Sequence, residues 1–143
     1  MKARLEQFGF EVDLLIDADR RRLNVAVSAF TSKLQPGDVS LIHYSGHGVT
    51  LDGENFLLPI DVPAPGSADK ELLKAEAIGL TSLIERIKGA GARTQIFIID
   101  ACRDNPYAQA GTRSVGMTRG LARIDAPKGF IMYSAGYGQT ALA

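Results

Sequence analysis

The chain has 143 residues, of which 45% are hydrophobic and 22% are charged, which suits one domain with an ordinary packed core. Its 16 basic and 16 acidic residues balance, which argues against a nucleic-acid footprint or a polybasic membrane patch. The apolar runs are too short to span a bilayer, and the first residues lack the apolar stretch of a signal peptide, so we expect a cytoplasmic protein.

The first part of the chain is predicted to hold two helices with a strand between them. Residues 1–8 show helical apolar spacing, and Gly9 is typical of the residue that follows a helix. Residues 10–16 become wholly apolar, which favours a buried strand. Either Asp17 or Asp19 is suited to cap the next helix. The apolar face of that helix is formed by Leu23, Ala26, Val27, Phe30 and Leu34.

A turn, a strand and a hairpin are predicted next. Residues 35–38 read Gln-Pro-Gly-Asp, a typical turn, and residues 39–44 form a strand that ends at the Ser-Gly-His-Gly of residues 45–48. Asp52-Gly53 separates two apolar triplets, which is a strong hairpin signal.

The remaining elements are taken from apolar runs and turn residues. Residues 59–69 contain three prolines and are predicted to form a loop, and residues 83–87 belong to a helix. Residues 95–99 form a third strand, and residues 129–134 form the last one. Between them, residues 105–128 show no firm period and are predicted to form a long exposed loop.

This order of elements predicts one α/β domain over residues 1–143. Strands that alternate with helices favour a mostly parallel sheet with helices on both faces. Right-handed crossovers place the carboxyl ends of parallel strands at one edge, where catalytic sites gather. His47 follows the second strand and Cys102 follows the third, so both are expected at that edge.

Cys102 is the only cysteine, which leaves two interpretations, a buried small hydrophobic residue or a nucleophile. It lies beyond an apolar run and among Asp100, Arg103 and Asp104, where a thiol is near solvent and able to react. A neighbouring imidazole can take the thiol proton or protonate the leaving amine.

The chain has two histidines, which are assigned different roles. His43 lies inside a strand and is predicted to be a half-buried structural residue with a hydrogen bond. His47 lies between Gly46 and Gly48, which allow a sharp turn and a close approach to a ligand. A plain glycine turn is the alternative, but an imidazole there suits acid–base chemistry. The Gly48 amide is a candidate oxyanion donor.

Two motifs resemble those of the caspase superfamily, Tyr-Ser-Gly-His-Gly at residues 44–48 and Asp-Ala-Cys-Arg at residues 100–103. In that superfamily the histidine lies about 50 residues before the cysteine. Within the superfamily the chain resembles bacterial metacaspases and paracaspases, also called orthocaspases. The resemblance extends over nearly the whole chain, including residues 58–61 and 119–122.

The resemblance implies a cysteine endopeptidase with a catalytic dyad of His47 and Cys102. It also implies an oxyanion hole formed by the backbone amides of Gly48 and Cys102. The implied fold is the three-layer caspase–haemoglobinase-like α/β fold. This chain is expected to be the large-subunit portion, without the family's first strand and without its small-subunit region.

The residue two positions before Cys102 separates the branches of the superfamily. Caspases have glutamine there and cut after aspartate, whereas metacaspases and paracaspases have aspartate, as Asp100 does here, and cut after arginine or lysine. A carboxylate in the pocket pairs with a guanidinium and repels an acidic side chain. Ser45 matches a serine that helps to line this pocket in metacaspases. The alternative for Asp100 is an acid that caps local amides.

The expected partners are protein or peptide substrates with a basic residue at the cleavage site, and neither nucleic acid nor membrane; the oligomeric state is not predicted. Calcium-activated metacaspases carry an acidic cluster where residues 75–80 here contain a single glutamate. Since a calcium site needs six or more oxygen ligands, we expect no metal and no other cofactor. Arg113 and Arg119 in the long loop are candidates for self-cleavage, or else solvated surface cations.

Two other classes of function compete with the endopeptidase. The first is a non-catalytic caspase-like module for regulation or assembly, inactive through truncation, although both dyad positions are filled. The second is a nucleotide-binding Rossmann-like domain. It is weaker, because no Gly-x-Gly-x-x-Gly follows the first strand and no phosphate-binding loop occurs.

Overall fold

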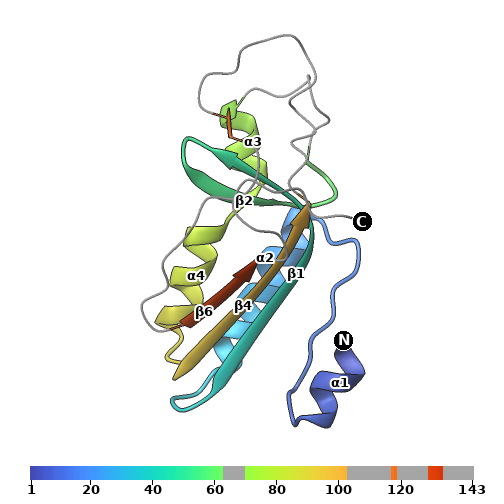
Figure 1. The fold of residues 1–143 in the computed structure, drawn as a ribbon, viewed down its shortest axis with the longest axis vertical. Helices are drawn as coiled ribbons and strands as arrows, with labels where there is room; N and C mark the ends of the chain where they lie inside the picture. The colour runs from blue at the N-terminus through green and yellow to red at the C-terminus, as the bar shows by residue number, and fades with distance from the viewer. Residues whose placement is uncertain (63–69, 103–116, 119–128, 134–143) are drawn as a thin grey trace.

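The computed structural model describes residues 1–62, 70–102, 117–118 and 129–133 (Figure 1). In these ranges the chain forms helices and one sheet. In chain order the elements are α1 (Lys2–Gln7), α2 (Arg20–Lys33), β1 (Val39–Leu51), β2 (Glu54–Leu58), α3 (Lys70–Glu76), β3 (Ile78–Gly79), α4 (Leu80–Gly89), β4 (Thr94–Cys102), β5 (Met117–Thr118) and β6 (Gly129–Tyr133). Most of the predicted loop over residues 105–128 lies outside the described residues.

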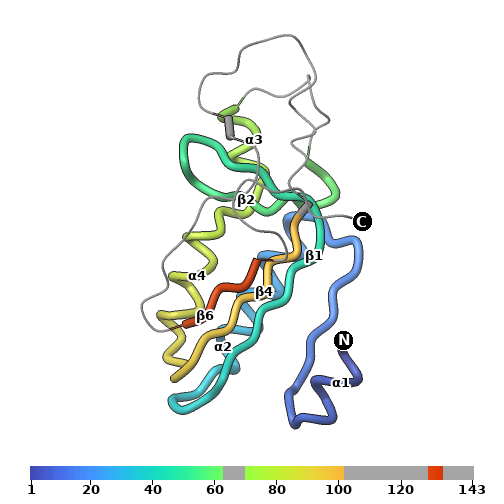
Figure 2. Tube along the Cα trace, viewed as in Figure 1, coloured from blue at the N-terminus to red at the C-terminus, as the bar shows by residue number. Residues whose placement is uncertain are grey.

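The sheet has six strands, with the order β3-β2-β1-β4-β6, and β5 pairs with β1. β1, β4 and β6 are parallel neighbours, and Figure 2 shows their traces running side by side. β2, β3 and β5 join antiparallel. The predicted α/β fold with a parallel centre is therefore confirmed.

The main core lies on one face of the parallel strands. One face of β4 points toward the helices. It carries the alternating buried residues Phe97, Ile99 and Ala101. Both α2 and α4 contribute apolar side chains to this cluster. The contributing residues are Val27, Phe30 and Leu34 of α2 and Leu83, Ile84 and Ile87 of α4.

A second, smaller core lies on the other face, beneath the β1–β2 hairpin. Val49 and Leu51 belong to the opposite set of alternating positions from Tyr44, and they pack against Phe56 and against Leu73 of α3. The sheet therefore carries helices on both faces, as the sequence predicted, with α2 and α4 on one face and α3 on the other at the hairpin end. None of the helices that the structure describes is long and apolar enough to cross a membrane.

The turn of the hairpin follows the sequence prediction. Asp52 and Gly53 have φ values of 51° and 81°, the left-handed pair of a two-residue hairpin turn. Lys70 and Lys74 of α3 form ion pairs with the Asp52 carboxylate, the second at 2.9 Å. These ion pairs hold α3 against the tip of the hairpin.

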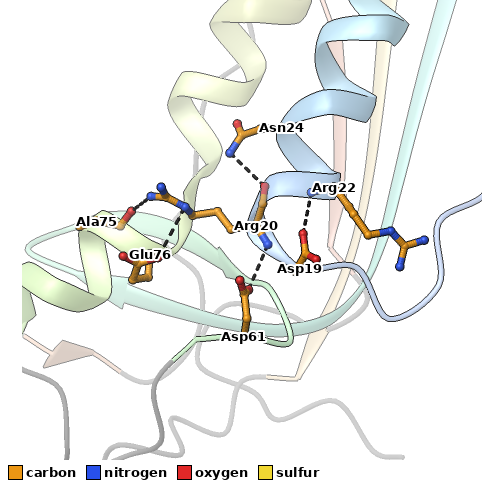
Figure 3. A network of polar contacts seen from close by, with 7 residues as sticks. All are labelled: Asp19, Arg20, Arg22, Asn24, Asp61, Ala75 and Glu76. Atoms are coloured by element: carbon orange, nitrogen blue, oxygen red, sulfur yellow. Dashed lines mark hydrogen bonds and ion pairs between the residues drawn. The ribbon is translucent and has the colours of Figure 1, made fainter.

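The N-terminus of α2 is fixed by a network of polar contacts (Figure 3). Asp19 is the N-cap, and its carboxylate accepts from the Arg22 amide at 2.7 Å. Asp61, which follows β2, accepts from the Arg20 amide at 3.0 Å. The Arg20 side chain forms an ion pair with Glu76 of α3 at 3.5 Å. It also donates a hydrogen bond to the carbonyl oxygen of Ala75. The start of α2, the end of β2 and the end of α3 are thus joined.

The prediction of a buried strand over residues 10–16 is wrong. This segment is not in a strand, and Leu14 and Ile16 are 59% and 65% exposed. A strand requires a neighbouring ladder for its backbone groups, and in the described part of the chain no strand pairs with this segment. Instead, Lys33 at the end of α2 holds it through ion pairs with Glu11 and Asp13. A hollow of about 450 Å³ separates it from the start of β1.

Candidate active site

The register between β1 and β4 brings the two predicted catalytic positions together. The parallel ladder begins at Val39 and Thr94 and ends with His47 paired to Cys102. Since neighbouring strands lie about 4.8 Å apart, the two backbones are adjacent although the residues are far apart in the sequence. Both positions are at the carboxyl end of β4, at the edge where the sequence placed them.

His47 lies inside a strand, which corrects the prediction that it follows the end of one in a glycine turn. β1 does not end at Tyr44 but continues to Leu51. His47 is paired with Leu58 of β2 on one side and with Cys102 of β4 on the other. The backbone is therefore held between two strands while the imidazole is exposed to solvent. Such a position fixes a side chain more closely than a loop does.

The predicted specificity residues are also paired across the same two strands. Ser45 is opposite Asp100 in the register, two residues before His47 and Cys102 along the strands. Ser45 is exposed and Asp100 is half-buried. Alternation along β1 places Ser45 and His47 on the same face of the sheet. This face is opposite the one covered by α2 and α4, so neither of these two helices covers the polar side chains of Ser45 and His47.

The two predicted oxyanion amides come from neighbouring strands. Gly48 is buried and lies opposite Leu57 in the β1–β2 ladder, directly after His47. Cys102 is the last residue of β4. The arrangement therefore places the two backbone segments beside the exposed imidazole.

His43 is exposed, which corrects the prediction that it is half-buried. It pairs with Ile98 and lies on the same face as His47, two pleats earlier on β1. The prediction assumed that both faces of the strand are covered at this point, but α2 and α4 cover only the other one. His43 is therefore a surface histidine on the strand that carries His47.

Tyr44 is a residue of the site that sequence reasoning did not identify. Its hydroxyl lies 2.7 Å from the carbonyl oxygen of His47 and 3.0 Å from that of Leu58. Its ring packs against the main core, and burial raises the pKa of Tyr44 to about 12. The signal was present in the motif, because residues two apart on a strand share a face, which places Gly46 beside the ring of Tyr44.

Gly46 has a different role from the one that the sequence suggested. It does not have a positive φ, so it makes no sharp turn. A Cβ built at Gly46 would lie 2.7 Å from the Tyr44 hydroxyl oxygen and 2.9 Å from the ring carbon that bears it. Glycine is therefore needed here to leave room for the phenol.

The remaining predicted site residues, Arg113 and Arg119, lie outside the described residues. Among the described residues, no group of three or more His, Cys, Asp and Glu side chains is arranged to hold a metal ion.

Comparison with known proteins gives the family. Residues 1–143 match the family model of the caspase domain. The human mucosa-associated lymphoid tissue lymphoma translocation protein 1 is 27% identical over 99 residues, which are 69% of this chain and 11% of that protein. A protein from a Desulfuromonadales bacterium described as a probable protease is 33% identical over 82 residues, 54% of this chain and 9% of its own length. The chain thus spans only a small part of these relatives.

The matched residues include the β1 and β4 motifs that carry His47 and Cys102. The resemblance found in the sequence is therefore confirmed, and the chain belongs to the caspase-domain family of cysteine peptidases.

Proposed function

We propose that this domain is a cysteine endopeptidase in which Cys102 is the nucleophile and His47 is its acid–base partner. The observation that carries this proposal is the register of β1 and β4, which pairs the two residues. Membership of the caspase-domain family supports it independently. The exposed imidazole on a backbone held from both sides is suited to repeated proton transfer.

The proposed reaction follows the chemistry of a thiol and an imidazole. A free cysteine thiol is mostly protonated at neutral pH, so a neighbouring imidazole is needed to remove the proton of Cys102. The thiolate attacks the scissile carbonyl carbon, and the amides of Gly48 and Cys102 donate to the oxyanion that forms. The His47 imidazolium then protonates the leaving amine. A water molecule, deprotonated by His47, hydrolyses the thioester and restores the thiol.

The same face suggests the substrate class. Asp100 and Ser45 are opposite each other, two register positions from the proposed dyad. A half-buried carboxylate pairs strongly with a guanidinium or ammonium group and repels a carboxylate. We therefore propose that the domain cleaves proteins or peptides after Arg or Lys.

The test is hydrolysis of fluorogenic peptides with Arg, Lys or Asp before the scissile bond. We expect turnover of the Arg and Lys peptides, and a loss of about a hundredfold or more for Asp100→Asn on them. Cys102→Ala and His47→Ala should abolish turnover. His43→Ala is the matched control, because His43 is an exposed histidine on the same strand and face. Turnover that survives Cys102→Ala, or equal rates on Asp and Arg peptides, would contradict the proposal.

A further inference from the structure

We propose that Tyr44 is a positioning residue for His47, which holds the backbone of the histidine from the core side of the sheet. The inference rests on the proposed dyad and extends it. The imidazole of His47 is exposed, so what fixes its place is the backbone from which it projects. That backbone is held by the strands on either side of β1 and, from the core, by the Tyr44 phenol.

The phenol contacts two strands with one group. A hydroxyl has a single proton, which Tyr44 shares between the carbonyl oxygens of His47 at 2.7 Å and Leu58 at 3.0 Å. His47 and Leu58 are register partners in the β1–β2 ladder. The hydroxyl therefore links β1 and β2 at the position from which the His47 side chain projects.

The surroundings of the hydroxyl make this contact strong. The Tyr44 ring packs against the main core, and the bond from its hydroxyl to the Leu58 carbonyl is partly buried, where water competes less for the carbonyl. Because burial raises the pKa of Tyr44 to about 12, the hydroxyl keeps its proton throughout the pH range in which a thiol and an imidazole react. The donor is thus present whenever the proposed reaction runs.

Gly46 completes the arrangement. The Tyr44 side chain folds along β1 to reach the carbonyl three residues further on, and it passes over Gly46. Any side chain at Gly46 would collide with the phenol, whose oxygen lies 2.7 Å from the place of a Cβ. Tyr44 and Gly46 therefore act as a pair that supports His47.

The expected effect is on the rate of the chemical step and not on substrate binding. The Tyr44 hydroxyl faces the core, whereas Ser45 and Asp100 lie toward the other face. Loss of the hydroxyl frees the His47 carbonyl and lets the imidazole depart from its place opposite Cys102. A displacement of about 1 Å can reduce a rate by roughly a hundredfold, so a tenfold to hundredfold fall in kcat is expected.

The experiment compares Tyr44→Phe with Ser40→Ala. Ser40 also lies on β1, and its hydroxyl is 3.5 Å from the Thr94 carbonyl at the opposite end of the strand, so Ser40→Ala removes a hydroxyl from β1 away from His47. Three quantities are measured at a temperature at which each variant is folded: kcat and KM on the Arg peptide, and the rate at which iodoacetamide alkylates the thiol between pH 5 and 9. The chain has one cysteine, so alkylation reports Cys102 alone.

We expect Tyr44→Phe to lower kcat, to change KM by less than about twofold, and to slow alkylation near neutral pH. Ser40→Ala should change neither. Unchanged kcat and alkylation in folded Tyr44→Phe would overturn the proposal, and so would a loss that merely follows the unfolded fraction. Alkylation that His47→Ala leaves unaffected would refute the dyad itself, which distinguishes that failure from a failure of the Tyr44 proposal.

Gly46→Ala provides a second route if Tyr44→Phe does not fold. It displaces the phenol without removing the hydroxyl, and we expect the same fall in kcat. If the two changes act through the same contact, the double variant should lose less than the product of the separate losses. Losses that multiply fully would show that Gly46 and Tyr44 act independently, and would overturn the pairing.

Discussion

At the scale of single residues, the histidine of the site depends on neighbours that carry no obvious chemistry. The imidazole of His47 is exposed, while the groups that hold its backbone are a phenol and two strands. The dyad is proposed from the sequence, because a lone cysteine after an apolar strand and a histidine between glycines suggest catalysis, and the structure adds that the two positions are register partners. The proposed support of His47 by Tyr44 could not be predicted from the sequence, because this contact depends on how the Tyr44 ring packs against the main core.

Because of the Tyr44 hydroxyl, the free energy of unfolding should fall as the pH rises in the alkaline range. The pKa of Tyr44 is raised by burial to about 12 in the folded state, against 10.0 when unperturbed. Between these values the folded chain keeps a proton that the unfolded chain loses, so stability is complete below pH 10 and falls as pH rises toward 12. At pH 11 the free energy of unfolding is lower by about 1.4 kcal/mol, and above pH 12 the loss approaches roughly 3 kcal/mol.

Urea unfolding at pH 8 and pH 11 measures this loss. Tyr44→Phe should show a smaller fall between the two pH values than the parent chain, since it keeps the other tyrosines and lacks only this hydroxyl. Parallel pH dependence in both proteins would show that the Tyr44 phenol is not protected by burial.

At the scale of elements, turn and cap chemistry was predictable and strand boundaries were not. The Asp52-Gly53 hairpin and the cap of α2 formed as local rules require. β1 is longer than predicted because β2 provides a ladder for the residues after Gly46. Residues 10–16 have the apolar pattern of a strand but no neighbouring strand among the described residues. A pattern within one segment cannot reveal whether a partner strand is present.

The cap of α2 gives a prediction at this scale. Asp19 accepts from the Arg22 amide at 2.7 Å, so Asp19→Ala leaves an amide of the first turn without its partner. We expect the free energy of unfolding to fall by about 1 kcal/mol. Asp17 has a left-handed φ of 46° and is the matched control, since Asp17→Asn keeps a residue that tolerates this conformation.

Chemical denaturation measures the free energy of unfolding of Asp19→Ala and Asp17→Asn, and so distinguishes the contribution of the cap from that of the preceding turn. A loss of stability for Asp17→Asn as large as that for Asp19→Ala would indicate that the whole turn, and not the cap, stabilises the start of α2. This start matters for the site, because Asp61 joins it to the chain just after Leu58.

At the scale of the whole molecule, two cores lie on opposite faces of one sheet, and each holds different helices against it. The main core, with Ile84 at its centre, holds α2 and α4 against the parallel strands. The smaller core, with Leu73, holds α3 against the hairpin. The α/β class and the edge that carries the site followed from the order of elements. The division into two cores did not, since it requires the length of β1 and the position of α3.

Substitution of one residue from each core tests this division. Ile84→Ala and Leu73→Ala each remove a side chain that is almost fully buried, and each should cost about 2–5 kcal/mol. By hydrogen exchange, Leu73→Ala should reduce protection mainly in β2 and α3, and Ile84→Ala throughout the parallel strands. Equal loss of protection everywhere in both variants would show that the cores unfold as one unit.

The register that pairs His47 with Cys102 also determines which changes of length the domain can accept. The distance between these backbones is set by the ladder from Val39 to His47, and not by the connection between the two strands. Extra residues between Pro59 and Arg93 that fall outside α3, β3 and α4 therefore lengthen a connection without altering the pairing. By contrast, deletion of one residue within β1 ahead of His47 would move the imidazole to the face covered by α2 and α4. Insertions should therefore be found in the connections of relatives, while these two strands keep their length up to the paired residues.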